Sequence, residues 1–209
     1  MSLLLITAVD AEAAALADVP DALVVVAGIG RTNAAAATTQ AILEHGPFEA
    51  VCSVGVAGAL PGAELQLGET IVAEACIYAE EGLQTNDAFL DMQAMGFPLG
   101  DFTGNRVPVD ERLLTRLQDH APIGLIATVA TCSGSDLQAQ TVARRTRAIA
   151  EAMEGAAVVH AARRLGAAAI ELRTISNTTG DRGQQQWDLH GAFDAMARDV
   201  PPLLQHLRN

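Results

Sequence analysis

Short, continuous apolar runs recur along most of this chain, separated by segments rich in polar or small residues. Such runs occur at residues 2–9, 22–28, 48–58, 123–131 and 167–176, and residues 69–79 alternate enough to form a longer strand. Continuous apolar runs of strand length are typical of strands that are buried on both faces of a parallel sheet. We therefore expect a buried sheet built from these segments.

Helix-like segments lie between several of these runs. They cover residues 33–46, 153–166 and, for the most part, 187–207. The first has a cap-like residue, Thr32 or Asn33, at its start and Gly46 at its end. This alternation predicts one domain over residues 1–209, with a three-layer α/β/α fold and a central mixed, largely parallel sheet.

Residues 80–109 interrupt the alternation. Their periodicity is weak, and they contain several glycines and prolines. Long irregular segments in compact domains often act as lids or interface arms. We expect this segment to be such an excursion from the domain.

Composition narrows the classes of function. The net charge is −12 and only 3% of the residues are aromatic, so neither phosphate-backbone binding nor base stacking by nucleic acid is expected. All 13 basic residues are arginine. The absence of lysine excludes Schiff-base enzymes and the phosphate-binding loop that uses a lysine.

The three cysteines, Cys52, Cys76 and Cys132, are scattered without the spacing of a zinc site or disulfide framework. They suit buried thiols in a reducing compartment. No charged-then-apolar signal segment opens the chain, and no apolar run is long enough to span a bilayer. We expect a cytoplasmic protein without a metal, a cofactor or a membrane partner.

Polar and small residues gather where the predicted strands end. Because ligands bind at the carboxyl ends of strands in an open α/β sheet, these segments are expected to line one pocket. They are Asp10 with Glu12, "GIGRTN" at 28–33, "GVAG" at 55–58, "TCSGSD" at 131–136 and "SNTTGDR" at 176–182.

Two carboxylates stand out among these polar residues. Glu12 directly follows the first strand and Glu154 begins an alanine-rich helix. A carboxylate can accept hydrogen bonds from both hydroxyls of a vicinal diol, which suits Glu154 to a ribose. Glutamates are also common in the first turn of a helix, where the helix dipole stabilises their negative charge. Spacing alone favours this structural interpretation of both residues.

Several longer motifs are more specific than these single residues. In order along the chain they are "ITAVDAEAAAL", "AGIGRTNAA", "SVGVAGAL" with "LGETIVAEA", "AMEGAAVVHAA" and "ELRTISNTTGDR". Together they resemble the purine and uridine phosphorylase/nucleosidase superfamily, and most closely the futalosine hydrolases of the alternative menaquinone pathway. "MEGAAVVHAA" and "ISNTTGDR" are the specific parts, because glycine turns after strands are common.

The resemblance implies a phosphorylase-like fold and an N-glycosyl hydrolase that releases hypoxanthine from futalosine. It gives Glu12 the part of activating the attacking water, and Met153 and Glu154 the part of gripping the ribose. It further implies that Val56 and Gly58 lie beside the substrate and that Leu137 and Gln138 line the base pocket. Members of the family are homo-oligomers, so we expect a dimer or a larger assembly whose arm closes a neighbouring pocket.

The leaving base is where this chain departs from the adenine nucleosidases. They carry aspartate at the position of Asn177, whose amide can instead donate to O6 or N7 of a 6-oxopurine. Asp181 is a second candidate for assisting the base. Both residue types also favour turns, and Asp136 is a candidate helix cap.

Three other functions stay open. A methylthioadenosine/S-adenosylhomocysteine nucleosidase is disfavoured by Asn177. A phosphorylase is disfavoured because no arginine precedes Arg31, so phosphate would meet Asp10 and Glu12. A non-catalytic nucleoside-binding protein is disfavoured by the presence of both Glu12 and Glu154.

Overall fold

The computed structural model describes residues 2–208, which form ten strands and six helices. The strands are β1 (Leu3–Thr7), β2 (Ala22–Val26), β3 (Ala50–Ala59), β4 (Thr70–Tyr78), β5 (Gly82–Gln84), β6 (Phe89–Asp91), β7 (Arg106–Pro108), β8 (Ile123–Thr128), β9 (Ala150–Ala152) and β10 (Ala169–Thr178). The helices are α1 (Asp10–Ala15), α2 (Arg31–His45), α3 (Glu111–Leu117), α4 (Asp136–Thr146), α5 (Gly155–Arg164) and α6 (Leu189–His206).

The central sheet is mixed and closes on itself. Its strands run in the order β10-β4-β8-β9-β3-β1-β2, and β10 also pairs with β3, so β3, β10, β4, β8 and β9 form a ring. Pairing is parallel between β1 and β2, β1 and β3, β3 and β10, β4 and β8, and β8 and β9. The mixed, largely parallel sheet is confirmed, but the expectation of an open sheet is wrong because β10 reaches both β3 and β4.

The predicted apolar runs form the strands, and burial explains why. Leu3, Leu4 and Leu5 of β1 are fully buried, and almost every position of β3 and β10 is buried as well. The run at 22–28 is different, because β2 lies at the edge of the sheet and is only half-buried. It follows that the expectation of a buried strand there is wrong.

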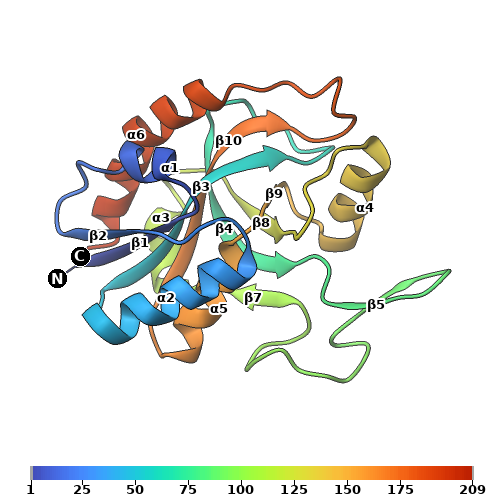
Figure 1. Cartoon of the computed structure of the whole chain (residues 1–209), viewed down its shortest axis with the longest axis horizontal. Coiled ribbons are helices and arrows are strands. Elements are labelled where there is room, and N and C mark those ends of the chain that lie inside the picture. Colours follow the sequence, from blue (N-terminus) through green and yellow to red (C-terminus); the bar gives the residue numbers. More distant parts are fainter. Residues whose placement is uncertain (1, 209) are drawn as a thin grey trace.

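Helices cover the sheet in two groups (Figure 1). α2 packs against α5, and α5 contacts β3, β8 and β10. α6 packs against β10 and β4 and also contacts α1 and α3. This arrangement is the three-layer α/β/α fold that the alternation of strands and helices predicts.

Some element starts differ from the sequence-based expectations. α2 begins at Arg31 with Gly30 as its N-cap, rather than after Thr32 or Asn33. α4 is capped by Ser135, whose side chain accepts from the backbone N–H of Gln138, so Asp136 is the first helical residue and not the cap. Several neighbouring Ser, Thr, Asn, Asp or Gly residues can each serve as an N-cap, and the backbone geometry decides which one does. The sequence alone therefore places a helix start only to within one or two residues.

Residues 80–109 leave the domain as an arm and return through β7, as expected. β5 and β6 form a two-stranded hairpin that projects beyond the sheet (Figure 1). The arm exposes three large apolar side chains, Leu83, Leu90 and Phe97. In the described part of the chain, no helix combines the length and the apolar character needed to cross a membrane.

Candidate active site

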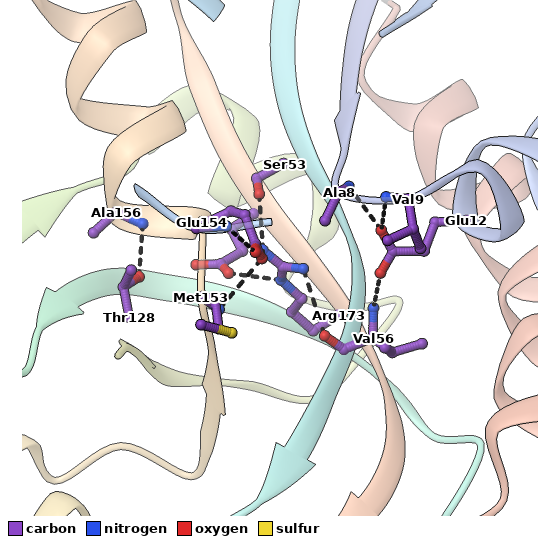
Figure 2. Close-up of polar contacts among 12 residues, drawn as sticks. Ala8, Val9, Glu12, Ser53, Val56, Thr128, Met153, Glu154, Ala156 and Arg173 are labelled. Atoms are coloured by element: carbon purple, nitrogen blue, oxygen red, sulfur yellow. Dashed lines mark hydrogen bonds and ion pairs between the residues drawn. The ribbon is translucent and has the colours of Figure 1, made fainter. Parts of the chain in front are cut away.

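A cluster of charged side chains lies inside the fold where β1, β3 and β10 meet the turn before α5. Figure 2 shows Glu12 on one side of this cluster and Glu154 on the other, with Arg173 between them. Glu12, Glu154 and Arg173 are 3%, 6% and 2% exposed. Charged groups are rarely buried to this extent unless they are paired, so the contacts of each decide what it can do.

Glu12 accepts hydrogen bonds from backbone N–H groups of the turn after β1 and of strand β3. Its Oε2 accepts from Ala8 at 2.8 Å and from Val9 at 3.3 Å, which caps the first turn of α1. Its Oε1 accepts from the backbone N–H of Val56 on β3 at 2.9 Å. A glutamate that served only as a cap would not need the bond to Val56, so the carboxylate is also fixed with respect to β3.

Val56 contributes through its backbone. Besides the N–H that binds Glu12, its carbonyl lies 3.5 Å from Nη1 of Arg173. The neighbouring Gly55 leaves the space between these side chains open, since a Cβ at position 55 would collide with Glu12 Oε1 and Arg173 Nη1. Glycine at position 55 thus lets Glu12 and Arg173 face each other.

Glu154 is the N-cap residue of α5 and points toward α2 and β10. Its Oε1 accepts from the backbone N–H of Gly30 at 3.0 Å, and its Oε2 lies 3.4 Å from Nη2 of Arg173. Gly30 has φ of 95°, in the region that favours glycine, which presents its N–H to the carboxylate. Glu154 therefore joins the "GIGRTN" segment to the start of α5 and to β10.

Arg173 lies on β10 and contacts Glu154 and two further residues, Glu171 and Ser53. Its Nε donates to Glu171 Oε1 at 2.8 Å and its Nη2 to Ser53 Oγ at 3.1 Å. Burial by itself would lower the pKa of the guanidinium, but the carboxylates of Glu171, Glu154 and Glu12 raise it above its usual value. Three carboxylates thus surround a single permanent cation.

Asn177 lies at the far end of β10, in the segment that opens into polar residues. A bulge between Ile175 and Asn177 sets the register so that Asn177 lies opposite Gly58. Its Oδ1 accepts from Ser176 Oγ at 2.9 Å, and its Nδ2 lies 3.0 Å from the carbonyl of Thr178. Because Nδ2 already donates one N–H to the Thr178 carbonyl, the amide keeps one N–H for a further partner.

Asp181 has a well-defined partner in the neighbouring loop. Its Oδ1 accepts from the backbone N–H of Asp136 at 3.0 Å, and Asp136 Oδ1 accepts from the backbone N–H of Asp181 at 3.0 Å. This reciprocal pair, together with the bond from Arg182 N–H to the Gly134 carbonyl at 3.1 Å, joins the "TCSGSD" and "SNTTGDR" loops. The contacts give Asp181 a part in positioning these loops, and its catalytic role stays a prediction.

The other predicted substrate contacts differ in their exposure and surroundings. Met153 is half-buried next to Glu154, and its backbone N–H lies 3.3 Å from Glu154 Oε2. Leu137 is 73% exposed in the first turn of α4, and Gln138 is half-buried beside it. Leu137 is therefore a surface side chain, and the contact of Leu137 and Gln138 with a base stays a prediction.

Sequence reasoning missed Arg173, Glu171 and Ser53. A signal was present, because Glu171 and Arg173 interrupt an otherwise apolar strand segment two residues apart and so share one face of β10. Their position in the ring of strands then brings them to Glu12 and Glu154.

The cations nearest the cluster are already neutralised. Arg173 is paired as described, and Arg31 forms ion pairs with Glu80, at 3.4 Å, and Glu81. Neither guanidinium is therefore free to bind an anion. The electrostatics of this site favour a neutral or cationic ligand over a phosphate.

The sequence is similar to known proteins over most of its length. The family model of the phosphorylase superfamily matches residues 7–204. Futalosine hydrolase of Thermus thermophilus is 37% identical, covering 85% of this chain and 78% of that protein, and futalosine hydrolase of Acidothermus cellulolyticus is 37% identical, covering 91% and 85%. A 5′-methylthioadenosine/S-adenosylhomocysteine nucleosidase of Marinomonas is 25% identical, covering 80% and 73%.

Solved structures are similar in fold. S-adenosylhomocysteine nucleosidase of Streptococcus pyogenes, in complex with 5-methylthiotubericidin, superimposes with a TM-score of 0.81 at 21% identity and covers 100% of this chain and 98% of that one. A futalosine hydrolase mutant of Helicobacter pylori gives a TM-score of 0.78 at 19% identity and covers 99% and 98%.

Proposed function

Because this chain belongs to the phosphorylase superfamily, we propose that its site hydrolyses the N-glycosidic bond of futalosine and releases hypoxanthine, in the alternative menaquinone pathway. The observation that carries the proposal is that β10 bears both Arg173, which lies in the charged cluster with Glu12 and Glu154, and, further along the strand, the amide of Asn177. The identity of 37% to futalosine hydrolases from two organisms supports this substrate over an adenine nucleoside.

Glu12 is the group that activates water in this proposal. Three backbone N–H groups fix its carboxylate at the inner end of the site. The carboxylate takes a proton from water as the water oxygen bonds to the anomeric carbon and the bond from that carbon to the base nitrogen breaks. General-base assistance of this kind contributes roughly 10²- to 10⁴-fold to a rate.

Glu154 and Met153 hold the ribose. Glu154 is anchored through Gly30 and Arg173, which leaves its carboxylate oriented to accept from the 2′ and 3′ hydroxyls. Met153 offers a flexible apolar surface beside the sugar. The sugar develops positive charge in the transition state. The three carboxylates of this cluster outnumber its single guanidinium, so they stabilise that charge.

Asn177 stabilises the leaving base. As the glycosidic bond breaks, negative charge spreads onto the purine, and the Nδ2 donor of Asn177 can bind O6 or N7. An ionised aspartate at this position would place an acceptor against O6. Asn177 therefore favours 6-oxopurine nucleosides over adenine nucleosides.

Water rather than phosphate is the nucleophile. Arg31 is paired with Glu80 and Glu81, and Arg173 is surrounded by carboxylates, so neither is free to bind a phosphate. The exposed position of the arm supports a further proposal, that the chain forms homo-oligomers. The cytoplasmic location stays a prediction.

One experiment tests the function. The purified protein is incubated with futalosine, inosine and methylthioadenosine, with and without inorganic phosphate, and the released base is identified by chromatography. We expect hypoxanthine from futalosine at a rate that phosphate does not change. Preferential release of adenine would assign the chain to the adenine nucleosidases, and a requirement for phosphate would make it a phosphorylase.

A further inference from the structure

Glu171 is a fully buried carboxylate behind the candidate active site. It is 0% exposed, and its Oε1 accepts from Arg173 Nε at 2.8 Å. Its Oε2 has no partner with normal hydrogen-bond geometry within residues 2–208, and the polar side chain that lies against the carboxylate from β4 is the Cys76 thiol, a weak donor. None of the roles assigned to Glu12, Glu154 or Asn177 accounts for this residue.

Keeping an ionisable group in this place is costly. A buried polar atom without a partner carries its full desolvation penalty, and buried ion pairs can often be replaced by apolar residues of the same volume without loss of stability. The fold also reserves space for the carboxylate, because a Cβ at Gly155 would collide with it. Glycine at the first position of α5, next to Glu154, is thus matched to Glu171 on β10.

The carboxylate of Glu171 controls where the guanidinium of Arg173 can lie. With Nε bound to Glu171, the planar fork turns its Nη1 and Nη2 atoms toward Val56 O, Ser53 Oγ and Glu154 Oε2. A guanidinium presents its donors in a rigid geometry, so fixing Nε fixes the other two nitrogens as well. Without this bond, only the longer contacts with Val56, Ser53 and Glu154 would hold the guanidinium.

The charges around Arg173 come from several elements. Glu171 lies beside it on β10, Glu12 faces it from α1, and Glu154 faces it from the turn before α5. On β4, burial and then the charge of Glu171 raise the pKa of the Cys76 thiol well above its usual value, so this side adds no negative charge. One guanidinium therefore faces three carboxylates, and removing the charge of Glu171 would reduce the excess of negative charge.

We propose that Glu171 is a positioning residue of the nucleosidase reaction, which acts through Arg173 to hold Glu154 in place and, by its charge, keeps the site selective for a positively charged sugar. This inference rests on the proposed function, since it assumes that a nucleoside occupies the site. Glu171 touches no substrate itself.

The test compares two ligands that differ in the charge of the sugar. 9-Deazainosine has a neutral ribose and cannot be hydrolysed, and its iminoribitol analogue is a cation at neutral pH. Affinities for both are measured by calorimetry on the wild type, Glu171→Gln and Glu74→Gln. Glu74 is the matched control, because it loses the same charge from an exposed ion pair with Arg106 on the same sheet.

We expect Glu171→Gln to lower the preference for the cation over the neutral ligand at least about 5-fold, since unit charges in a partly desolvated site interact over several ångströms. Its kcat on futalosine should fall about 10-fold while KM changes less than about 3-fold, because the effect is felt mainly in the transition state. Glu74→Gln should match the wild type in both measurements.

An unchanged ligand preference and kcat in folded Glu171→Gln would overturn the proposal and leave Glu171 with a structural role. If Glu171→Gln does not fold, Glu171→Asp provides the second test, because it keeps the charge and should keep the preference for the cation. A wild type that binds both ligands and hydrolyses futalosine establishes the proposed function separately. A wild type that does neither overturns both.

Discussion

Asn177 and Gly58 lie opposite each other on the parallel strands β10 and β3, and the amide of Asn177 occupies the space that a side chain at position 58 would need. A Cβ at position 58 would lie 2.9 Å from Asn177 Nδ2 and 2.8 Å from Thr179 Cγ2. The absence of a side chain at position 58 thus leaves room for the Asn177 amide, which is the group that we propose to contact the leaving base.

Gly58→Ala should therefore displace the Asn177 amide. Overpacking of a buried site typically costs about 1–3 kcal/mol, and misplacing a catalytic group by about 1 Å can cost up to about 100-fold in rate. We expect kcat/KM on futalosine to fall at least about 10-fold, with a lower melting temperature. Gly183→Ala is the control, because no atom lies within 4 Å of its added Cβ. Equal activity of the two variants would show that Gly58 does not set the position of Asn177.

Glu12→Gln should lower kcat by about 100-fold or more while leaving nucleoside binding nearly intact, since the amide cannot take a proton from water. In the variant, the N–H₂ group of glutamine would face at least one backbone N–H that now donates to the carboxylate, so some loss of stability is expected as well. Melting temperatures and the affinity for 9-deazainosine separate a folding defect from a catalytic one. Turnover close to that of the wild type would remove Glu12 from the mechanism.

Glu154→Gln should mainly weaken recognition of the ribose. The amide has one acceptor oxygen, whereas the carboxylate binds Gly30 N–H and Arg173 and still has lone pairs for hydroxyls. Loss of a charged hydrogen bond costs roughly 1.5–3 kcal/mol. The affinities of the wild type and the variant for ribo and 2′,3′-dideoxy ligands measure this. If the wild type binds both ligands equally well, Glu154 does not hold the diol.

Asn177→Asp tests the specificity for the base. An ionised aspartate would repel O6, so kcat/KM on futalosine should fall at least about 10-fold, the equivalent of about 1.4 kcal/mol of transition-state stabilisation. The measurement compares futalosine with its adenine counterpart for the wild type and the variant. A wild type that prefers the adenine substrate would return the chain to the adenine nucleosidases, and so would a variant with unchanged preference.

Asp181→Asn and Asp181→Ala separate loop positioning from acid–base chemistry. Asparagine keeps an oxygen that can accept from Asp136 N–H, whereas alanine removes it. We expect the asparagine variant to retain kcat/KM within about 3-fold and the alanine variant to lose about 1 kcal/mol of stability, the worth of one hydrogen bond, together with activity. A loss of about 100-fold in the asparagine variant would instead make Asp181 a catalytic acid or base.

The sequence by itself determined most of the strands and pointed to three candidate site residues. The apolar runs predict β1, β3, β8 and β10 because strands buried on both faces exclude polar side chains, and the alternation of residues 69–79 predicts β4. The motifs around Glu12, Glu154 and Asn177 mark those residues through their resemblance to the phosphorylase superfamily, since a position after a strand or at a helix start is equally suited to ordinary cap and turn residues. β9 escaped prediction because its three residues are too short to show a period.

Only the tertiary structure decided which of these residues meet. The register of β10 against β3, including the bulge before Asn177, places that amide opposite Gly58. Closure of the strand ring brings Glu171 and Arg173 to the carboxylates of Glu12 and Glu154. These contacts join residues far apart in the chain. Local patterns record whether a position is buried, whereas the identity of its neighbours follows from strand register and close packing.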